Sequence, residues 1–135
     1  MAQTFELEIA TPDRLLVREQ VSEAQIPAAN GYLGVLPEHS PLLSLLGTGE
    51  LSYAMDGQTK SLAVSGGFIE VLPDQVRVLA DNAEAAESID VARAEAALKR
   101  AEQRLKDPRE KNVDVARALN ALNKAQARLK TARDK

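Results

Sequence analysis

Cysteine and tryptophan are absent from this chain, and histidine occurs only once. A chain without cysteine has no disulfide framework, and one histidine is too few for the usual transition-metal sites. No apolar run approaches the length of about 20 residues that a membrane-spanning helix needs. The segment from Met1 to Glu8 also lacks the basic and apolar regions of a signal peptide. We therefore expect a cytosolic protein without a metal site.

Glycine and the aromatic residues are missing from the C-terminal part of the chain. All 7 glycines, both tyrosines and both phenylalanines lie before residue 69. The charge divides near the same place: residues 1–87 hold 4 Lys+Arg and 13 Asp+Glu, net −9, whereas residues 88–135 hold 13 and 7, net +6. With 135 residues in all, only the first part can bury a core of its own. The sequence thus predicts an acidic body, residues 1–86, and a basic arm, residues 87–135.

Apolar and polar residues alternate along much of the body, as in strands with one buried face. Phe5, Leu7 and Ile9 alternate with two glutamates, and Asp56-Gly57 separates two further alternating runs. Asp-Gly in that position predicts a hairpin turn, because the turn requires positive φ. The acidic residues are expected on the outer faces of the sheets, as solvated surface charge.

Further turn-forming residues divide the rest of the body into short segments. Gly66-Gly67 predicts a break between strands, Pro73-Asp74 predicts a turn, and the strand after it is expected to end near Ala80. Eight to ten short strands without an intervening helix predict a mainly β domain, a flattened antiparallel barrel or sandwich. Within it, Gly31 to Leu43 is expected to be a rigid loop, because two prolines flank His39.

The arm has the periodicity of two amphipathic helices. Ser88 is a candidate N-cap for the first helix, with Asp90 in its first turn, and Pro108 ends it; Asn112 or Asp114 can cap the second. The apolar seams step by three and four residues and comprise Val91, Ala94, Leu98, Ala101 and Leu105, then Val115, Ala118, Leu122, Ala125, Leu129 and Ala132. The pattern predicts an antiparallel two-helix hairpin. Because its seams are rich in alanine, the hairpin buries little apolar area and can undock or repack.

The basic surplus of the arm points to an acidic partner. Nucleic acid is disfavoured, because the arm has no aromatic side chain for stacking and its positive charges alternate with Glu and Asp. An acidic protein surface fits better, supplied by the body itself or by another chain. The same charges also fit a solvated helix face with no partner.

Three motifs resemble those of the epsilon subunit family of bacterial F-type ATP synthases, over essentially the full length. Gly31 to Leu43 resembles the family's Gly-x-Leu-Gly-x-x-Pro-x-His-x-Pro-Leu loop, and Ser65 to Val71 resembles a second signature. Ile89 to Ala94 resembles Ile/Leu-Asp-x-x-Arg-Ala, the signature that opens the family's first C-terminal helix. The motifs occur in the family's order.

The resemblance implies a flattened barrel or sandwich of about ten strands followed by a mobile helical hairpin. It implies a non-catalytic central-stalk subunit that binds the gamma subunit and the ring of c subunits and couples proton flow to ATP synthesis. The hairpin would inhibit ATP hydrolysis by extending into the catalytic head of alpha and beta subunits. Such a subunit is peripheral, on the cytoplasmic face of the plasma membrane, and requires no cofactor.

The resemblance also implies contact residues. Contact with the c ring would involve Tyr32 and His39, although Tyr32 replaces an acidic residue found in some members and Glu38 replaces a common glycine. The acidic segment of the beta subunits would face Arg93, Arg100, Arg104 and Arg128.

In some members the folded hairpin binds ATP as a regulator. By matching position, the ligand set here would be Glu84, Ile89, Asp90, Arg93, Ala94, Arg100, Lys124 and Arg128. Lys124 stands where those members have arginine, so a point charge replaces a bidentate fork and weakens phosphate binding. Alternatively, Asp90 and Arg93 form an i,i+3 pair that pins the helix to the body.

The residues by themselves leave other functions open. A free-standing β-sandwich with a basic helical arm would serve as an adaptor between proteins. An enzyme would depend on His39, and its local candidate partners, Glu38 and Ser40, are its immediate neighbours in sequence and so point away from it. Catalysis by this chain is therefore not expected.

Overall fold

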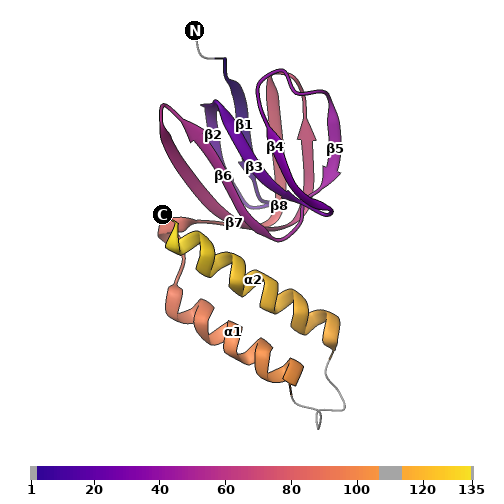
Figure 1. Cartoon of the computed structure of the whole chain (residues 1–135), viewed down its shortest axis with the longest axis vertical. Coiled ribbons are helices and arrows are strands. Elements are labelled where there is room, and N and C mark those ends of the chain that lie inside the picture. Colours follow the sequence, from indigo (N-terminus) through magenta and orange to yellow (C-terminus); the bar gives the residue numbers. More distant parts are fainter. Residues whose placement is uncertain (1–2, 107–113, 135) are drawn as a thin grey trace.

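Eight strands, a short 3-10 helix and two α-helices make up the part of the chain that the computed structural model describes, residues 3–106 and 114–134 (Figure 1). In chain order they are β1 (Phe5–Ala10), β2 (Leu15–Val21), β3 (Glu23–Ala28), β4 (Gly31–Val35), β5 (Leu42–Leu45), β6 (Gly49–Met55), β7 (Gln58–Val71), β8 (Gln75–Ala85), η1 (Ala86–Ser88), α1 (Val91–Lys106) and α2 (Val115–Arg133). The predicted mainly β domain followed by two helices is confirmed.

The strands form two layers that share two long strands. The first sheet contains β2, β1, the first half of β8, the second half of β7, and β5. The second sheet contains the end of β8, the start of β7, β6, β3 and β4. Inward-facing side chains from both layers form one hydrophobic core, which contains Phe5, Leu7, Ile9, Ile69, Val76 and Val78 from the first and Ala24, Ile26, Leu51, Leu62 and Val64 from the second.

The alternation predicted from the sequence is confirmed in β1. Phe5, Leu7 and Ile9 are buried, while Glu6 and Glu8 lie on the outer face. The turn at Asp56-Gly57 is confirmed as well, since Met55 pairs with Gln58 and both turn residues have positive φ. Both features could be predicted from the sequence, because each depends only on residues that are neighbours along the chain.

Two strands are longer than the sequence suggested. The predicted break at Gly66-Gly67 is wrong, because β7 runs through both glycines for 14 residues and bends there from one layer into the other. The strand expected to end near Ala80 continues to Ala85 and pairs with the first half of β7. Each long strand therefore replaces two short ones, which explains why eight strands are described and not about ten.

Two further expectations about the body are corrected. The sheet is not antiparallel throughout, because β1 and β8 start at the same end of the sandwich and pair in parallel. There the amide of Glu6 donates to the carbonyl of Asp74 at 3.0 Å. The segment Gly31 to Leu43 is not one loop: its ends belong to β4 and β5, and only residues 36–41 connect them.

The helices begin at aspartates. The expected cap at Ser88 is wrong, because η1 ends at that residue; the carboxylate of Asp90 instead accepts from the amide of Arg93 at 3.1 Å. Asp114 caps α2 in the same way, accepting from the amide of Arg117 at 3.1 Å. The other candidate cap, Asn112, and the helix-ending Pro108 lie outside the described residues.

The bend in β7 should be sensitive to any side chain at Gly67. Its φ is +121°, and a Cβ at this position would collide with the carbonyl of Leu79 on β8. We expect Gly67→Ala to lower the free energy of unfolding by about 2–5 kcal/mol in urea denaturation followed by circular dichroism. The control is Gly57→Ala, which also has positive φ but no atom within 4 Å and should lose about 1 kcal/mol. Equal losses would contradict this role for Gly67.

Candidate functional site

Three residues form a row across the outer face of the second sheet, which we call the acidic row. Glu50 of β6 lies opposite Ala63 of β7, and Ala63 lies opposite Glu84 of β8. Since adjacent strands are about 4.8 Å apart, the backbones of the two glutamates are about 10 Å apart. Ser61 and Ser65 continue the same face of β7, so the surface between the carboxylates is low and flat.

Helix α2 lies on the acidic row, next to the sandwich, and α1 lies on the far side of α2 (Figure 1). Arg128 pairs with Glu84 through Nε to Oε1 at 3.0 Å, and its Nη2 donates to Oε2 at 3.3 Å. Two residues further along α2, Lys130 Nζ lies 3.9 Å from Glu50 Oε1. The two acidic ends of the row thus contact two basic side chains of one helix.

Small side chains fill the space between these charge contacts. Ala63 packs with Ile89, which follows η1, and with Ala132 of α2. Ala127 and Thr131 of α2 are also buried, and the hydroxyl of Thr131 has no hydrogen-bond partner among the described residues. Close approach is possible because the residues that face each other here, Ala63 on the sheet and Ala127 and Ala132 on the helix, are small, but the apolar area removed from water is small as well.

The two helices pack through the alanines that the sequence placed in their seams. Ala94 and Ala101 of α1 and Ala118 and Ala125 of α2 are buried. The outermost seam residues differ, since Val91 and Val115 remain exposed. Of the second buried face of α2, the one that meets the sandwich, the predicted seam includes Ala132 and omits Ala127 and Thr131.

Glu50 is the most enclosed carboxylate of this interface. Its side chain is 10% exposed, and its Oε2 is buried without a hydrogen-bond partner in the described part of the chain. Burial raises the pKa of the Glu50 carboxyl, and a hydrogen bond and the charge of Asp134 raise it further, against the opposing effect of Lys130. The expectation that the body's carboxylates are solvated is therefore wrong for Glu50, because α2 covers it.

A pocket of about 220 Å³ opens beside the acidic row. Three residues of the predicted ATP set line it, namely Glu84, Lys124 and Arg128. Ser65 and Asn82, which pair in register on β7 and β8, add a hydroxyl and an amide to the same wall. The pocket lining therefore combines two cations and two neutral polar side chains, which suit phosphate oxygens, with the carboxylate of Glu84, which already pairs with Arg128.

The remaining residues of the predicted ATP set lie outside this pocket lining. Ile89 is buried in the cluster with Ala63, and Asp90 caps α1. Arg93 is exposed in the first turn of α1, and Ala94 is buried. Arg100 is exposed on α1 seven residues beyond Arg93, about 10 Å along the helix. Asp90 accepts from the backbone amide of Arg93, and a side-chain pair of these two residues that pins the helix to the body stays a prediction.

The arginines predicted to meet an acidic partner occupy two environments. Arg93, Arg100 and Arg104 are exposed on α1, the helix away from the sandwich (Figure 1). Arg128 differs, because its side chain is 22% exposed and paired with Glu84. In this conformation the body itself is the acidic surface that Arg128 meets.

The two residues predicted to contact the c ring are not brought together. Tyr32 lies near the start of β4, where its hydroxyl accepts from the amide of Glu50 at 3.2 Å, beside the acidic row. His39 lies beyond the other end of β4 in the loop of residues 36–41, and its Nδ1 is 2.8 Å from the carbonyl of Ser40. This loop sits at the end of the sandwich away from the hairpin, where the amide of Glu38 donates to the carbonyl of Pro73.

A second surface crosses the outer face of the first sheet, and we call it the apolar row. Its members lie opposite one another on five strands: Leu45, Phe68, Leu79, Ala10 and Leu15. The four large side chains are 50–56% exposed. No described element covers them.

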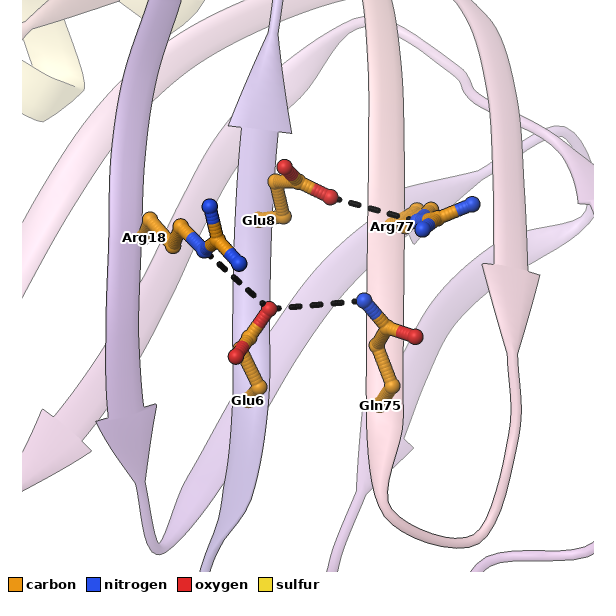
Figure 2. A network of polar contacts seen from close by, with 5 residues as sticks. All are labelled: Glu6, Glu8, Arg18, Gln75 and Arg77. Carbon is orange, nitrogen blue, oxygen red and sulfur yellow. Dashed lines mark hydrogen bonds and ion pairs between the residues drawn. The ribbon is translucent and has the colours of Figure 1, made fainter.

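Polar side chains surround the apolar row on the same sheet. Figure 2 shows Glu8 of β1 paired with Arg77 of β8 at 3.2 Å, and Glu6 paired with Arg18 of β2 at 3.4 Å. Gln75 also donates to Glu6 at 3.4 Å. Because these charges neutralise one another, the face presents an apolar stripe with no strong net charge beside it.

Sequence models of protein families match almost the whole chain. A sequence model described as "ATP synthase, Delta/Epsilon chain, beta-sandwich domain" matches residues 4–86, and one described as "ATP synthase, Delta/Epsilon chain, long alpha-helix domain" matches residues 87–133. The chain belongs to the delta/epsilon chain family of ATP synthases. The resemblance inferred from the three motifs is thereby confirmed.

Curated relatives of this delta/epsilon-family chain carry the name of the epsilon type. The ATP synthase epsilon chain of Solibacter usitatus (strain Ellin6076) is 60% identical over 108 residues, which cover 80% of this chain and 81% of that protein. The ATP synthase epsilon chain of Koribacter versatilis (strain Ellin345) is 59% identical over 105 residues, 78% of this chain and 74% of that protein.

Solved structures agree with the family. A chain in the cryo-EM structure of Euglena gracilis mitochondrial ATP synthase (OSCP/F1/c-ring in rotational state 1) superposes with a TM-score of 0.81 at 26% identity, covering 96% of this chain and 81% of that chain. A chain in the central stalk/c-ring structure from Tetrahymena thermophila shares the fold, with a TM-score of 0.58 at 12% identity, covering 98% and 96%. Neither described helix is long and apolar enough to cross a bilayer.

Four interface residues of this family member escaped the sequence analysis: Glu50, Ser65, Asn82 and Thr131. Their strand or helix pattern gave no sign that a second element would cover them. One signal was available for α2, because Lys124, Ala127, Arg128 and Thr131 follow i, i+3, i+4, i+7 spacing beside the apolar seam. The small members of that stripe indicate a second packing face.

Proposed function

We propose that this chain is a non-catalytic subunit of the ATP synthase central stalk, where it couples rotation of the c ring to ATP synthesis. Its hairpin restrains ATP hydrolysis when it leaves the sandwich and extends toward the catalytic head of alpha and beta subunits. Membership in the delta/epsilon family and the 60% identity to an epsilon chain support the stalk role. The observation that carries the regulatory role is the way α2 is held.

The contact between α2 and the sandwich is suited to reversible release. Its apolar part consists mainly of alanines, and in each of its two ion pairs water still reaches one partner, Lys130 at 60% exposed and Glu84 at 38%. Exposed or partly exposed pairs contribute roughly 0–1 kcal/mol each. Undocking would also return the unpaired Glu50 Oε2 and Thr131 Oγ1 to water. The free energy difference between docked and released states is therefore small.

In this proposal, the location of the chain is that of the complex to which it belongs. The chain associates peripherally with the membrane-bound enzyme through its partners, on the cytoplasmic face. Within the stalk, the loop of residues 36–41 with His39 faces the c ring, since it lies at the end of the sandwich away from the hairpin. Contact of Tyr32 with the ring stays a prediction.

Removal of the hairpin tests the regulatory role. With the catalytic head and the gamma subunit reconstituted, we expect ATP hydrolysis to be slower with the full chain than with a variant ending at residue 86. The reason is that the body, residues 4–86, keeps its own core and partner surface while the basic helices are lost. The measurement is steady-state hydrolysis at saturating amounts of either chain. Equal rates with both chains would remove the inhibitory role and leave the stalk role intact.

The apolar row is the surface that we assign to the gamma subunit. An apolar stripe across five strands suits the apolar side of a long partner. Because the charges beside the stripe pair with one another, the partner needs no complementary charge. The hairpin covers the other sheet, so both contacts can exist together.

A charge in the apolar row should prevent assembly with gamma. Phe68→Glu places a carboxylate in the middle of the row, where desolvation costs several kcal/mol. We expect affinity for gamma, measured by titration calorimetry, to fall at least about a hundredfold. Leu119→Glu is the control, because Leu119 is 44% exposed on α2 and outside the row. Loss of binding in both variants would indicate misfolding, which circular dichroism would detect, and unchanged binding of Phe68→Glu would disprove the assignment.

Regulatory ATP binding is a further part of the proposal, supported by the pocket beside the acidic row. Lys124 and Arg128 would hold phosphates, while Ser65 and Asn82 offer neutral polar groups. Arg128 of α2 also pairs with Glu84 of β8, so a ligand bound between these residues would join the helix to the sandwich. Bound ATP would thus favour the docked hairpin.

Titration calorimetry with ATP tests this pocket. We expect Arg128→Met to weaken binding roughly tenfold or more, because a charge-assisted bond to phosphate is lost. Arg133→Met is the matched control, since Arg133 is exposed on α2 and outside the pocket lining. No heat from the unmodified chain at millimolar ATP would remove ATP as a ligand.

A further inference from the structure

We propose that Tyr32 is a positioning residue for the docked hairpin: its hydroxyl holds the backbone of Glu50, the end of the acidic row that lies on β6. The inference rests on the proposed release of the hairpin and names a residue that sets how readily release occurs. The residues involved lie at the start of β6, where its pairing with β3 stops.

Strand β3 leaves the start of β6 without a ladder partner on one side. The pairing of these two strands joins residues 23–25 to residues 52–54 and ends there. Further along β3, Pro27 has no amide hydrogen to donate, and its carbonyl accepts from the amide of Gly47 at 2.8 Å. The amide of Glu50 therefore needs an acceptor from another element, because an unpaired backbone group costs free energy.

Tyr32 of β4 supplies this acceptor. It lies opposite Pro27 in the ladder of β3 and β4, so the two side chains share one face of the sheet. Since β3 lies between β4 and β6, the hydroxyl of Tyr32 reaches across β3 to accept from the amide of Glu50 at 3.2 Å. A side chain two strands away thus replaces the missing ladder bond.

The residue before Glu50 makes room for the hydroxyl. A Cβ at Gly49 would lie 2.7 Å from the hydroxyl oxygen of Tyr32 and 3.0 Å from the Cβ of Pro27. The φ of Gly49 is not in the left-handed region, so the close approach, and not the backbone conformation, calls for glycine here.

Glu50 connects this hydrogen bond to the docked helix. It lies opposite Ala63 of β7, which packs against Ala132 of α2. The side chain of Glu50 is 10% exposed, and its Oε1 lies 3.9 Å from Lys130 Nζ. A shift of the Glu50 backbone would therefore disturb the surface on which α2 rests.

Tyr32→Phe removes the hydroxyl and keeps the ring. Because Tyr32 is 55% exposed, this change leaves the hydrophobic core intact. We expect the amide hydrogen of Glu50 to exchange about two- to tenfold faster, the factor that one net hydrogen bond supplies. The measurement is nuclear magnetic resonance of the ¹⁵N-labelled full chain in heavy water.

An introduced thiol reports release of the helix, because the chain has no cysteine of its own. Ala132→Cys places the thiol where α2 packs on Ala63, so a water-soluble thiol reagent reaches it when the hairpin is released. We expect Tyr32→Phe to raise the labelling rate in this background by up to about tenfold. Thr11→Val is the control, since it removes a hydroxyl that bonds to Arg14 in the turn between β1 and β2, and it should leave the rate unchanged.

A second thiol, in a separate chain, distinguishes release of the hairpin from unfolding of the sandwich. Val78→Cys places it in the core at a fully buried position. Its labelling should stay far slower than that of Ala132→Cys, with and without Tyr32→Phe. Equal rates at the two sites in Tyr32→Phe would show that the hydroxyl supports only the fold of the sandwich, and the proposal would be overturned.

Gly49→Ala gives an independent variant in which Tyr32 and Glu50 both remain. The added methyl group displaces the hydroxyl, so labelling of Ala132→Cys should again be faster. Combined with Tyr32→Phe, its effect should be smaller than alone, because both changes break the same contact. Purely additive effects, or an unchanged exchange rate of the Glu50 amide in Tyr32→Phe, would refute the positioning role.

The outcome is separable from that of the proposed function. If the variant ending at residue 86 abolishes inhibition while Tyr32→Phe changes neither the exchange rate nor the labelling rate, the regulatory hairpin stands and the role of Tyr32 is wrong. If Tyr32→Phe raises both rates while truncation has no effect on hydrolysis, the role of Tyr32 stands and the inhibitory role is wrong.

Discussion

The close approach of α2 to the second sheet is the constraint on which the rest of this structure depends. The contact is made by small residues, Ala63 on the sheet and Ala127 and Ala132 on the helix, which let the two elements approach closely. Only at that short distance can Arg128 reach Glu84 while Lys130 reaches Glu50 on the other side. Small residues therefore set both the position of the helix and the weakness of its attachment, because alanine brings surfaces together while burying little apolar area.

The division of charge along the chain acquires a spatial meaning from this contact. The negative body and the positive arm meet in the acidic row, where part of each charge is neutralised. The arginines of α1 do not take part, since α1 faces away from the sandwich and its Arg93, Arg100 and Arg104 remain exposed. In the docked hairpin, basic side chains of α2 are thus paired with the body, whereas those of α1 remain available to a second acidic surface.

What could be predicted from the sequence is what depends on neighbours along the chain. Alternation in β1, the turn at Asp56-Gly57 and the alanine seams of the helices follow from periods of two and 3.6 residues. The burial of Glu50 could not be foreseen, since it arises from a helix 80 residues further on that packs over a strand whose own pattern is ordinary. The predicted break at Gly66-Gly67 was wrong for a related reason. The positive φ values of these glycines allow a bend within a strand as well as the end of a strand.

The strands shared by the two sheets have a mechanical consequence. β7 carries Phe68 of the apolar row and, five residues earlier, Ala63 of the acidic row, so one continuous backbone joins the two surfaces. β8 does the same with Leu79 and Glu84. A twisting load applied to one face is therefore transmitted to the other through covalent bonds and ladder hydrogen bonds. In the described part of the chain, the hairpin is attached by side-chain contacts and a short connection, which makes it the compliant part of an otherwise stiff body.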